Sequence, residues 1–161
     1  AYAYLSGFLN GTDGVPMLVP REVSGEESQV VYKDKDITVE AMHVPHGIVP
    51  AVAFKVQAAG ETFVFASDQN GSKAAFKDFA KDASLLVMHL VVPEDVSGVG
   101  RRLHAPPSVV GRVAGDAAAD KLVLSHFMAR SLRDLDANVA LVRENFGGEV
   151  VLADDLACVA L

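Results

Sequence analysis

The 161-residue sequence predicts a mixed α/β layer structure, and two patterns carry this prediction. Probable strands follow one another closely between residues 37 and 67, whereas strands and helices alternate from residue 72 onward. Strands that are close in sequence favour antiparallel pairing, and strand–helix alternation is typical of parallel strands covered by helices. The sheet is therefore expected to be mixed, with helices packed against it.

The first part of the chain is expected to be irregular and then to form a hairpin-rich sheet. Turn signals and prolines dominate residues 1–36, which we interpret as an irregular N-terminal segment, with a lid or a dimer arm as its candidate roles. The segments after it are rich in β-branched and aromatic residues and predict strands at 37–44, 51–57 and 62–67. The sequence AAGE at residues 58–61 predicts a hairpin connection between the last two strands.

The second part of the chain predicts strands separated by helices. Its first helix is amphipathic, because Ala75, Phe76 and Phe79 recur on one face. The expected elements are a helix at 72–82, an apolar strand at 84–92, a loop with Gly98, Gly100 and two arginines, a proline-opened helix at 105–120, a strand at 121–125, a helix at 134–146, and closing strands at 149–155 and 156–161. Cys158, the single cysteine, is expected to be a small buried hydrophobic residue.

Composition narrows the class of protein. Half of the residues are hydrophobic and the mean hydropathy is +0.26, which predicts burial on more than one side. No apolar run approaches the roughly 18 residues of a membrane span, so a membrane partner is not expected. With 14 basic and 21 acidic side chains the net charge is −7, which disfavours nucleic acid as a partner because such binding depends on neutralising phosphates.

The sequence has five histidines, and four of them lie at the end of an apolar strand or in the loop just after it. His46 lies between two predicted strands, Asp68 follows the strand at 62–67, and His126 follows the strand at 121–125. In layered α/β folds ligands bind at the ends of the strands, and oxygen and nitrogen donors together suit zinc, iron or manganese. A divalent-metal site is therefore predicted, against the alternative that each histidine is simply hydrogen-bonded and that Asp68 only starts a turn.

Several stretches resemble the C-terminal half of the metallo-β-lactamase superfamily, and RNase Z-like and arylsulfatase-like hydrolases are the nearest branch. They are VPHGIVPAVAFKVQAAGETFVFASDQNG, DASLLVMHL, LHAPPSVVGRVAGDAAADKLVLSHFMAR and GGEVVLADDLACVAL. The resemblance covers about residues 30–161. It implies a metallo-β-lactamase-like αββα sandwich, of which residues 37–161 supply mainly the C-terminal half, a mixed sheet with helices on its outer face.

The same resemblance implies roles for four residues. His46 resembles a metal ligand of the superfamily's third motif, Asp68 the carboxylate that bridges two metals, and His126 the last histidine ligand. His104, in LHAPP, resembles a loop histidine that assists departure of the leaving group, so His104 and Asp68 are the candidate catalytic residues. The implied cofactor is a divalent metal, with zinc first and iron or manganese as alternatives, and two ions in the complete enzyme.

The chain also departs from the pattern of this branch. The bridging aspartate lies in ASDQNG instead of Ser-Gly-Asp-Thr, and Met88-His89 replaces a His-Glu pair, so His89 is expected to be structural and tRNA processing is disfavoured. The superfamily's His-x-His-x-Asp-His motif is absent, and His43 and His46 would point to opposite sides of a strand end. The remaining ligands are therefore expected from a missing N-terminal half or from another chain.

The expected function is that of a metal-dependent hydrolase that cleaves an ester, phosphodiester or sulfate-ester bond of a small molecule with a metal-bound hydroxide. As an isolated 161-residue chain it could be incomplete or inactive. The alternative is a metal-poor, non-catalytic fragment or interaction module that associates through an exposed sheet face. A homo-oligomer is expected on either interpretation, because half of such a sandwich would expose an apolar sheet.

Overall fold

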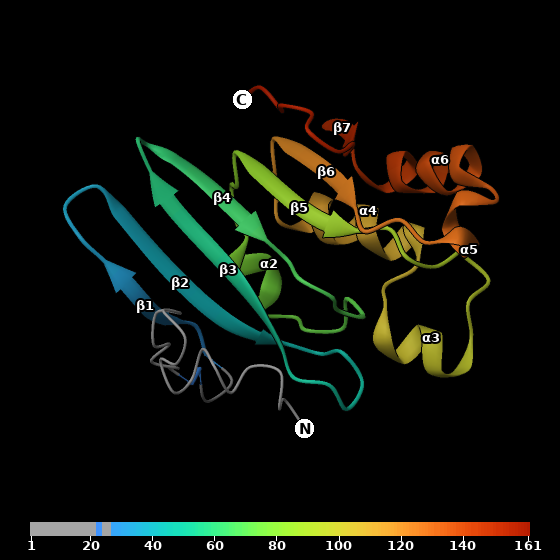
Figure 1. The fold of residues 1–161 in the computed structure, drawn as a ribbon, viewed down its shortest axis with the longest axis horizontal. Helices are drawn as coiled ribbons and strands as arrows, with labels where there is room; N and C mark the ends of the chain where they lie inside the picture. The colour runs from blue at the N-terminus through green and yellow to red at the C-terminus, as the bar shows by residue number, and fades with distance from the viewer. Residues whose placement is uncertain (1–21, 24–26) are drawn as a thin grey trace, which may run out of the picture.

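The computed structural model describes residues 22–23 and 27–161, which form a mixed seven-stranded sheet flanked by helices (Figure 1). The strands are β1 Gln29–Lys33, β2 Ile37–Val44, β3 Ala51–Ala58, β4 Glu61–Phe65, β5 Leu85–His89, β6 Lys121–Ser125 and β7 Glu149–Leu152, in sequence order across the sheet. The strands β1 to β4 pair antiparallel, and β4 to β7 pair parallel. The predicted mixed α/β sheet is therefore confirmed.

The helices lie on one face of the sheet and beyond one of its ends. They are α2 Phe76–Phe79, α3 Gly98–Leu103, α4 Pro107–Asp116, α5 Ala129–Leu132 and α6 Leu135–Asn145. In Figure 1, α2 and α4 lie behind the sheet, while α3 and α5 lie beyond the ends of the strands. Among the described helices, none is both long and apolar enough to cross a membrane.

The hydrophobic core fills the face of the sheet that the helices cover. Leu86 and Met88 of β5 and Leu122 and Leu124 of β6 are fully buried there. Helix α4 approaches α6 closely, because a Cβ added at Gly111 would lie 2.2 Å from a backbone oxygen of α6. Dense packing of this kind makes the covered face the main source of hydrophobic stabilisation.

The opposite face of the sheet is apolar but partly open. Phe54 of β3 pairs with Phe65 of β4, which pairs with Val87 of β5, and paired residues share a face. Phe54 and Phe65 are 41% and 47% exposed, and Tyr32 on β1 is 52% exposed. This open face accounts for part of the high apolar content of the chain.

The hairpin between β3 and β4 forms where the sequence predicts it. Ala59 and Gly60 have φ values of 54° and 85°, so both turn residues are left-handed, as in the two-residue turns that match the twist of a hairpin. The two faces of β3 and β4 are thereby fixed in register, with Ala58 opposite Glu61.

Four sequence-based predictions about the local structure are wrong. Residues 29–33 are not irregular but form β1, because the Asp34 carboxylate accepts hydrogen bonds from the next backbone amides and turns the chain back onto β2. The glycine-containing loop is helix α3. Residues 156–161 form no strand: Leu156 has a φ of 64°, which breaks the extended chain after β7, and Cys158 is exposed instead of buried.

Two helices are shorter than predicted, since α2 and α4 cover only the centres of 72–82 and 105–120. In α2 the predicted apolar face is present through Phe76 and Phe79, although Ala75 is exposed. The lid or dimer-arm role concerns a segment that lies largely outside the described residues, so it stays a prediction.

Candidate metal centre

The carboxyl ends of four strands gather at one edge of the sheet. Because β2 and β4 are both antiparallel to β3, and β4 to β6 are parallel, these strands all end on the same side (Figure 1). His46 follows β2, Asp68 follows β4, His89 ends β5 and His126 follows β6. Polar side chains from distant parts of the sequence therefore meet where ligands bind in layered α/β folds.

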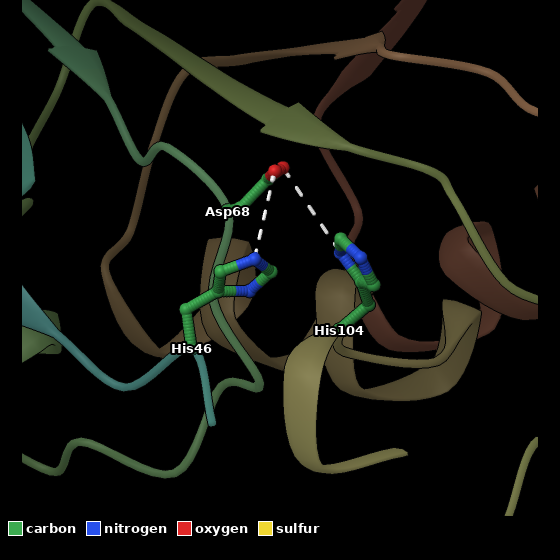
Figure 2. Close-up of side chains that lie close together, drawn as sticks. All are labelled: His46, Asp68 and His104. Atoms are coloured by element: carbon green, nitrogen blue, oxygen red, sulfur yellow. Dashed lines mark ion pairs between the residues drawn. The ribbon is translucent and has the colours of Figure 1, made fainter. Parts of the chain in front are cut away.

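The Asp68 carboxylate lies among ring nitrogens of three histidines. Its Oδ2 is 4.0 Å from Nε2 of His46 and 3.6 Å from Nε2 of His126, and its Oδ1 is 4.0 Å from Nδ1 of His104. Figure 2 shows the rings of His46 and His104 facing this carboxylate. The distances exceed hydrogen-bond length, but two atoms that share one zinc ion each lie about 2.0–2.2 Å from it and thus up to about 4.4 Å apart.

The structure brings His104 as close to Asp68 as the predicted ligand His46. Donor atoms of His46, Asp68 and His104 all lie within 4.8 Å of one another, which makes these three a candidate metal-binding group among the described residues. His126 also contacts this group but is half exposed. The ligand set predicted from the sequence, His46 with Asp68 and His126, and the separate role of His104 remain predictions.

A backbone hydrogen bond fixes the tautomer of His46. Its Nδ1 lies 2.8 Å from the carbonyl oxygen of Leu103, and a carbonyl can only accept, so Nδ1 carries the proton. The lone pair of Nε2 then faces Asp68. Metal-bound histidines usually donate their other ring N–H to a carbonyl or carboxylate in this way, so this donor set fits a divalent cation.

Three loops that carry the cluster are joined to one another by backbone groups. The amide of Asn70 donates to the carbonyl of Pro45 at 2.8 Å, and the amide of Ala105 donates to the carbonyl of Gln69 at 2.8 Å. Arg101 adds a side-chain hydrogen bond, at 3.0 Å, to the carbonyl of Asn70. The rings are therefore held in place before any ligand binds, which lowers the cost of binding one. No local sequence pattern indicated these contacts.

Strained backbone marks the same loops. Ser67, which precedes Asp68, and His126 itself have φ values of 56° and 53°, a left-handed conformation that costs a non-glycine residue about 1–3 kcal/mol. Gly47, which follows His46, has a φ of 62°, and a Cβ there would lie 2.8 Å from the side chain of Leu103. Strain of this kind clusters at ligand sites, which adds support for a functional role.

Behind the cluster, His89 is buried and neutral. It is only 2% exposed, its Nε2 accepts a 3.3 Å hydrogen bond from the amide of Ala105, and its Nδ1 has no partner among the described residues. Burial, followed by the neighbouring His104, lowers the pKa of His89 to about 4. Burial also lowers the pKa of His104, against the opposing effect of the Asp68 charge. Neutral imidazoles are the form that binds metals.

A cavity of about 320 Å³ opens beside the cluster and is lined by Asp68, His89 and His126 together with residues of the open face such as Phe65. The remaining histidine, His43, lies apart: its Nε2 donates to the carbonyl of Val23 at 2.7 Å, and it is not among the donors around Asp68. The cavity gives a small molecule access to the carboxylate and to His126.

Comparisons with known proteins agree with this arrangement, although no family model matches the chain. It is 30% identical over 103 residues to a "Ribonuclease Z" of Salinispora arenicola (strain CNS-205), which covers 63% of this chain and 33% of that protein. Among solved structures, the metallo-β-lactamase fold protein YhfI from Bacillus subtilis matches with a TM-score of 0.66 at 24% identity, over 76% of this chain and 49% of that one. The short form of human tRNase Z matches with a TM-score of 0.65 at 21% identity, over 83% and 46%.

The chain thus spans about a third of the curated relative and about half of the two solved structures. The resemblance to the metallo-β-lactamase superfamily and its RNase Z-like branch is confirmed for part of the chain. The described chain has part of the metallo-β-lactamase fold, and its 103 aligned residues are similar in sequence to a ribonuclease Z.

Proposed function

We propose that this chain forms part of a divalent-metal-dependent hydrolase that cleaves an ester-type bond: a carboxylic ester, a phosphodiester or a sulfate ester. The observation that carries the proposal is the Asp68 carboxylate, which lies 3.6–4.0 Å from ring nitrogens of three histidines supplied by three separate loops. A half-buried carboxylate beside this many imidazoles, all of them beyond hydrogen-bond length, has the composition of a metal site.

In the proposed site His46, Asp68 and His126 hold the cation. A divalent cation bound there supplies an activated water and neutralises negative charge that develops on the attacked centre. Three protein ligands with an open position are enough for one catalytic zinc, and a second ion would need further ligands from outside the described residues. The Leu103 carbonyl orients His46, so that its Nε2 stays available to the cation.

His104 has a separate proposed role next to these ligands. Its ring lies 4.9 Å from that of His46 and 5.1 Å from that of His89, measured between centroids, which confines it to one orientation. From there a ring N–H can be presented to the leaving oxygen, a contribution typically worth about 10²- to 10⁴-fold in rate. His104→Ala should therefore retain metal but lose turnover; unchanged turnover would remove the catalytic role of His104.

Asp68→Ala tests the proposal in the complete protein. The variant is expected to lose both bound metal, measured by elemental analysis after gel filtration, and hydrolysis of chromogenic esters, because the central oxygen donors are gone. Asp78→Ala is the matched control, since Asp78 is an exposed carboxylate on α2. Normal metal content in Asp68→Ala, at a level equal to the control, would contradict the proposal.

The open face of the sheet supports a second candidate function, that of a metal-poor interaction module. Phe54, Phe65 and Tyr32 expose more apolar surface than a monomer needs to leave uncovered. A metal-free oligomer in the gel-filtration experiment would favour this second function, whereas stoichiometric zinc, iron or manganese favours the hydrolase.

Among phosphodiesters, RNA is a substrate to test separately. The net charge of −7 argues against it, whereas the likeness to a ribonuclease Z argues for it, and this weakens the expectation that nucleic acid is disfavoured. RNA binding by the complete protein, measured as a function of salt concentration, decides whether RNA is bound through its phosphates, because phosphate contacts weaken steeply as salt rises.

A further inference from the structure

We propose that a cavity between α2 and α4 is a second ligand site, which binds the phosphate group of a small phosphorylated molecule. The cavity has a volume of about 230 Å³, and neither Asp68 nor the three histidines around it line this space. The site is therefore separate from the candidate metal centre, and its ligand need not be the molecule that is hydrolysed.

The walls of the cavity carry positive charge. Lys77 on α2 and Arg112 on α4 line it together with Lys73, which precedes α2, and Asp116 supplies the single carboxylate among the described lining residues. The two helices contact each other on the same face of the sheet (Figure 1). Cations from both helices thus line one small space.

This positive charge is concentrated in a chain that is acidic as a whole. Residues 69–77 and 96–115 contain five basic side chains and no acidic one, although the net charge of the chain is −7. The two segments lie against each other, because the Asn70 side chain donates to the carbonyl of Arg102 at 3.0 Å and the amide of Ala105 donates to the carbonyl of Gln69 at 2.8 Å. An anion is therefore attracted to these segments more strongly than to the acidic remainder of the chain.

The wall between the two helices is held in place by close packing. Gly71 lines the cavity and has a φ of 72°, and a Cβ at this position would lie 2.5 Å from Cγ1 of Val109 on α4. The amide of Ser72, the next residue, donates to the side chain of Asn70 at 3.0 Å. The shape of the cavity is thus fixed before a ligand enters, which lowers the cost of binding.

The two helix cations have no acidic partner in the part of the chain that the structure describes. Lys77 and Arg112 form no ion pair and no side-chain hydrogen bond there. Arg112 and Asp116 are four residues apart on α4, a spacing at which helical ion pairs can form, yet they do not pair. Lys121 differs, because it pairs with Glu149 at 3.1 Å. The donors of Lys77 and Arg112 are therefore available for an anion from outside.

The size and the charge of the cavity define this anion. A volume of about 230 Å³ is below the roughly 300–1,000 Å³ of pockets for drug-sized ligands, so the cavity suits one compact group. A phosphate monoester carries a charge of about −1.5 to −2 at neutral pH and several acceptor oxygens, which a guanidinium and an ammonium group can share. A carboxylate carries less charge and fewer oxygens. Phosphate should therefore be the preferred ligand group.

The test titrates inorganic phosphate and glycerol 3-phosphate into the complete protein by calorimetry and compares wild type with Lys77→Gln and Arg112→Gln. Lys81→Gln is the matched control for the first variant, because Lys81 is an exposed lysine just beyond α2 that does not line the cavity. Arg133→Gln is the control for the second, because Arg133 is an exposed arginine at the end of α5. Each control removes the same charge as its partner variant.

For Arg112→Gln we expect the dissociation constants of both probes to rise roughly 10-fold, the low end for a hydrogen bond between charged groups, because the cavity is open to water. Lys77→Gln should raise them by roughly 3-fold, because lysine acts as a point charge without the planar fork of arginine. Both controls should match wild type. Phosphate bound only at the metal centre would give the same affinity in every protein; that result, or no binding of either probe to wild type, would overturn the assignment.

A single-stranded RNA oligonucleotide distinguishes a small ligand from a nucleic acid. If Arg112→Gln weakens RNA binding while wild type binds neither small probe, the cations belong to an RNA surface and the assignment is overturned. If the small probes bind as expected and RNA affinity is equal in Arg112→Gln and Arg133→Gln, the small-ligand site is supported.

Metal content and ester hydrolysis separate this site from the proposed hydrolytic function. Both should be unchanged in Arg112→Gln, because Arg112 lines only a cavity apart from the donors around Asp68. A protein that cleaves no ester but binds phosphate through Arg112 would lose the proposed function and keep this site. Loss of bound metal in Arg112→Gln, together with the loss of phosphate affinity, would instead place the phosphate at the metal centre and overturn the assignment.

Discussion

The two faces of the sheet are both apolar, but among the described residues one is covered by helices and the other is only partly covered. On the helix side Leu86 and Met88 are fully buried, whereas Phe54 and Phe65 on the other side remain 41% and 47% exposed. The covered face is therefore the main source of hydrophobic stabilisation in the described chain, and the open face leaves apolar side chains partly exposed.

The candidate metal centre lies at the strand ends, where loops cover the face of the sheet that is otherwise partly open. His89 shares the open face with Val87 by strand alternation, yet it is 2% exposed because Ala105 and its neighbours cross over it. At the strand ends the loops thus bury side chains of this face, as the helices bury those of the other face. The site is built on a covered patch of an otherwise open surface.

The largest effect is expected on the covered face. Leu86→Ala would leave a cavity in the fully buried layer of β5 and should lower the free energy of unfolding by about 2–5 kcal/mol. Urea denaturation followed by circular dichroism measures this change. A loss below about 1 kcal/mol would mean that the helices pack loosely on this face.

The burial of His89 should make the stability of the folded chain depend on pH. The pKa of His89 is about 4 in the folded chain and about 6.5 when unfolded, so the unfolded state binds the extra proton between these values. Stability from this group is complete above pH 6.5 and is lost as the pH falls to about 4, by about 3 kcal/mol.

Urea denaturation of metal-free protein at pH 7, 5.5 and 4 measures the slope, and His89→Leu provides the comparison. The charges of Asp68, His46, His104 and His126 also act on His89, so the quantity that matters is the difference in slope between wild type and the variant. Identical slopes in the two proteins would show that His89 is accessible to protons in the folded chain.

Gly47→Ala tests how tightly the loops close the end of the sheet. A left-handed φ costs an alanine about 1–2 kcal/mol, and the added Cβ would also press on Leu103, whose carbonyl orients His46. Gly98→Ala is the matched control, because Gly98 has a similar φ of 59° and no atom within 4 Å of the added Cβ.

Both glycine variants should lose stability in thermal denaturation, but only Gly47→Ala should also bind zinc more weakly by calorimetry. Equal zinc affinity in the two variants would show that the contact with Leu103 does not affect zinc binding.

The smallest effect is expected on the open face. Phe54→Ser removes a ring that is already 41% exposed, so the free energy of unfolding should fall by only about 1 kcal/mol. The same urea denaturation as for Leu86→Ala provides the comparison. A loss as large as that of Leu86→Ala would show that another surface covers this face in the complete protein.

Much of the sheet could be predicted from the sequence, because its strands have strong local patterns. The apolar run KLVLS is β6, ITVEAMHV is β2, and the Ala-Gly turn residues mark the β3–β4 hairpin. The positions of Asp68 and His126 after strands were enough to predict that their side chains meet, because the carboxyl ends of parallel strands share one edge.

Other features depend on contacts that no local pattern encodes. Helix α3 contains two glycines, which lower its helix propensity. It still forms because neighbouring loops contact it: the Leu103 carbonyl accepts a hydrogen bond from His46, and Arg101 donates one to the Asn70 carbonyl. Cys158 was expected to be buried in a strand, but within residues 22–23 and 27–161 no strand lies beyond β7 to pair with that segment. The approach of His104 to Asp68 likewise follows from loop-to-loop hydrogen bonds that only the folded chain reveals.

The most direct test of the metal centre is anomalous diffraction at the zinc absorption edge from crystals of the complete protein grown with zinc. We expect a peak at bonding distance, about 2.0–2.2 Å, from Nε2 of His46 and from the Asp68 carboxylate. An ordered site without such a peak, with the rings of His46 and His126 turned away from Asp68, would contradict it.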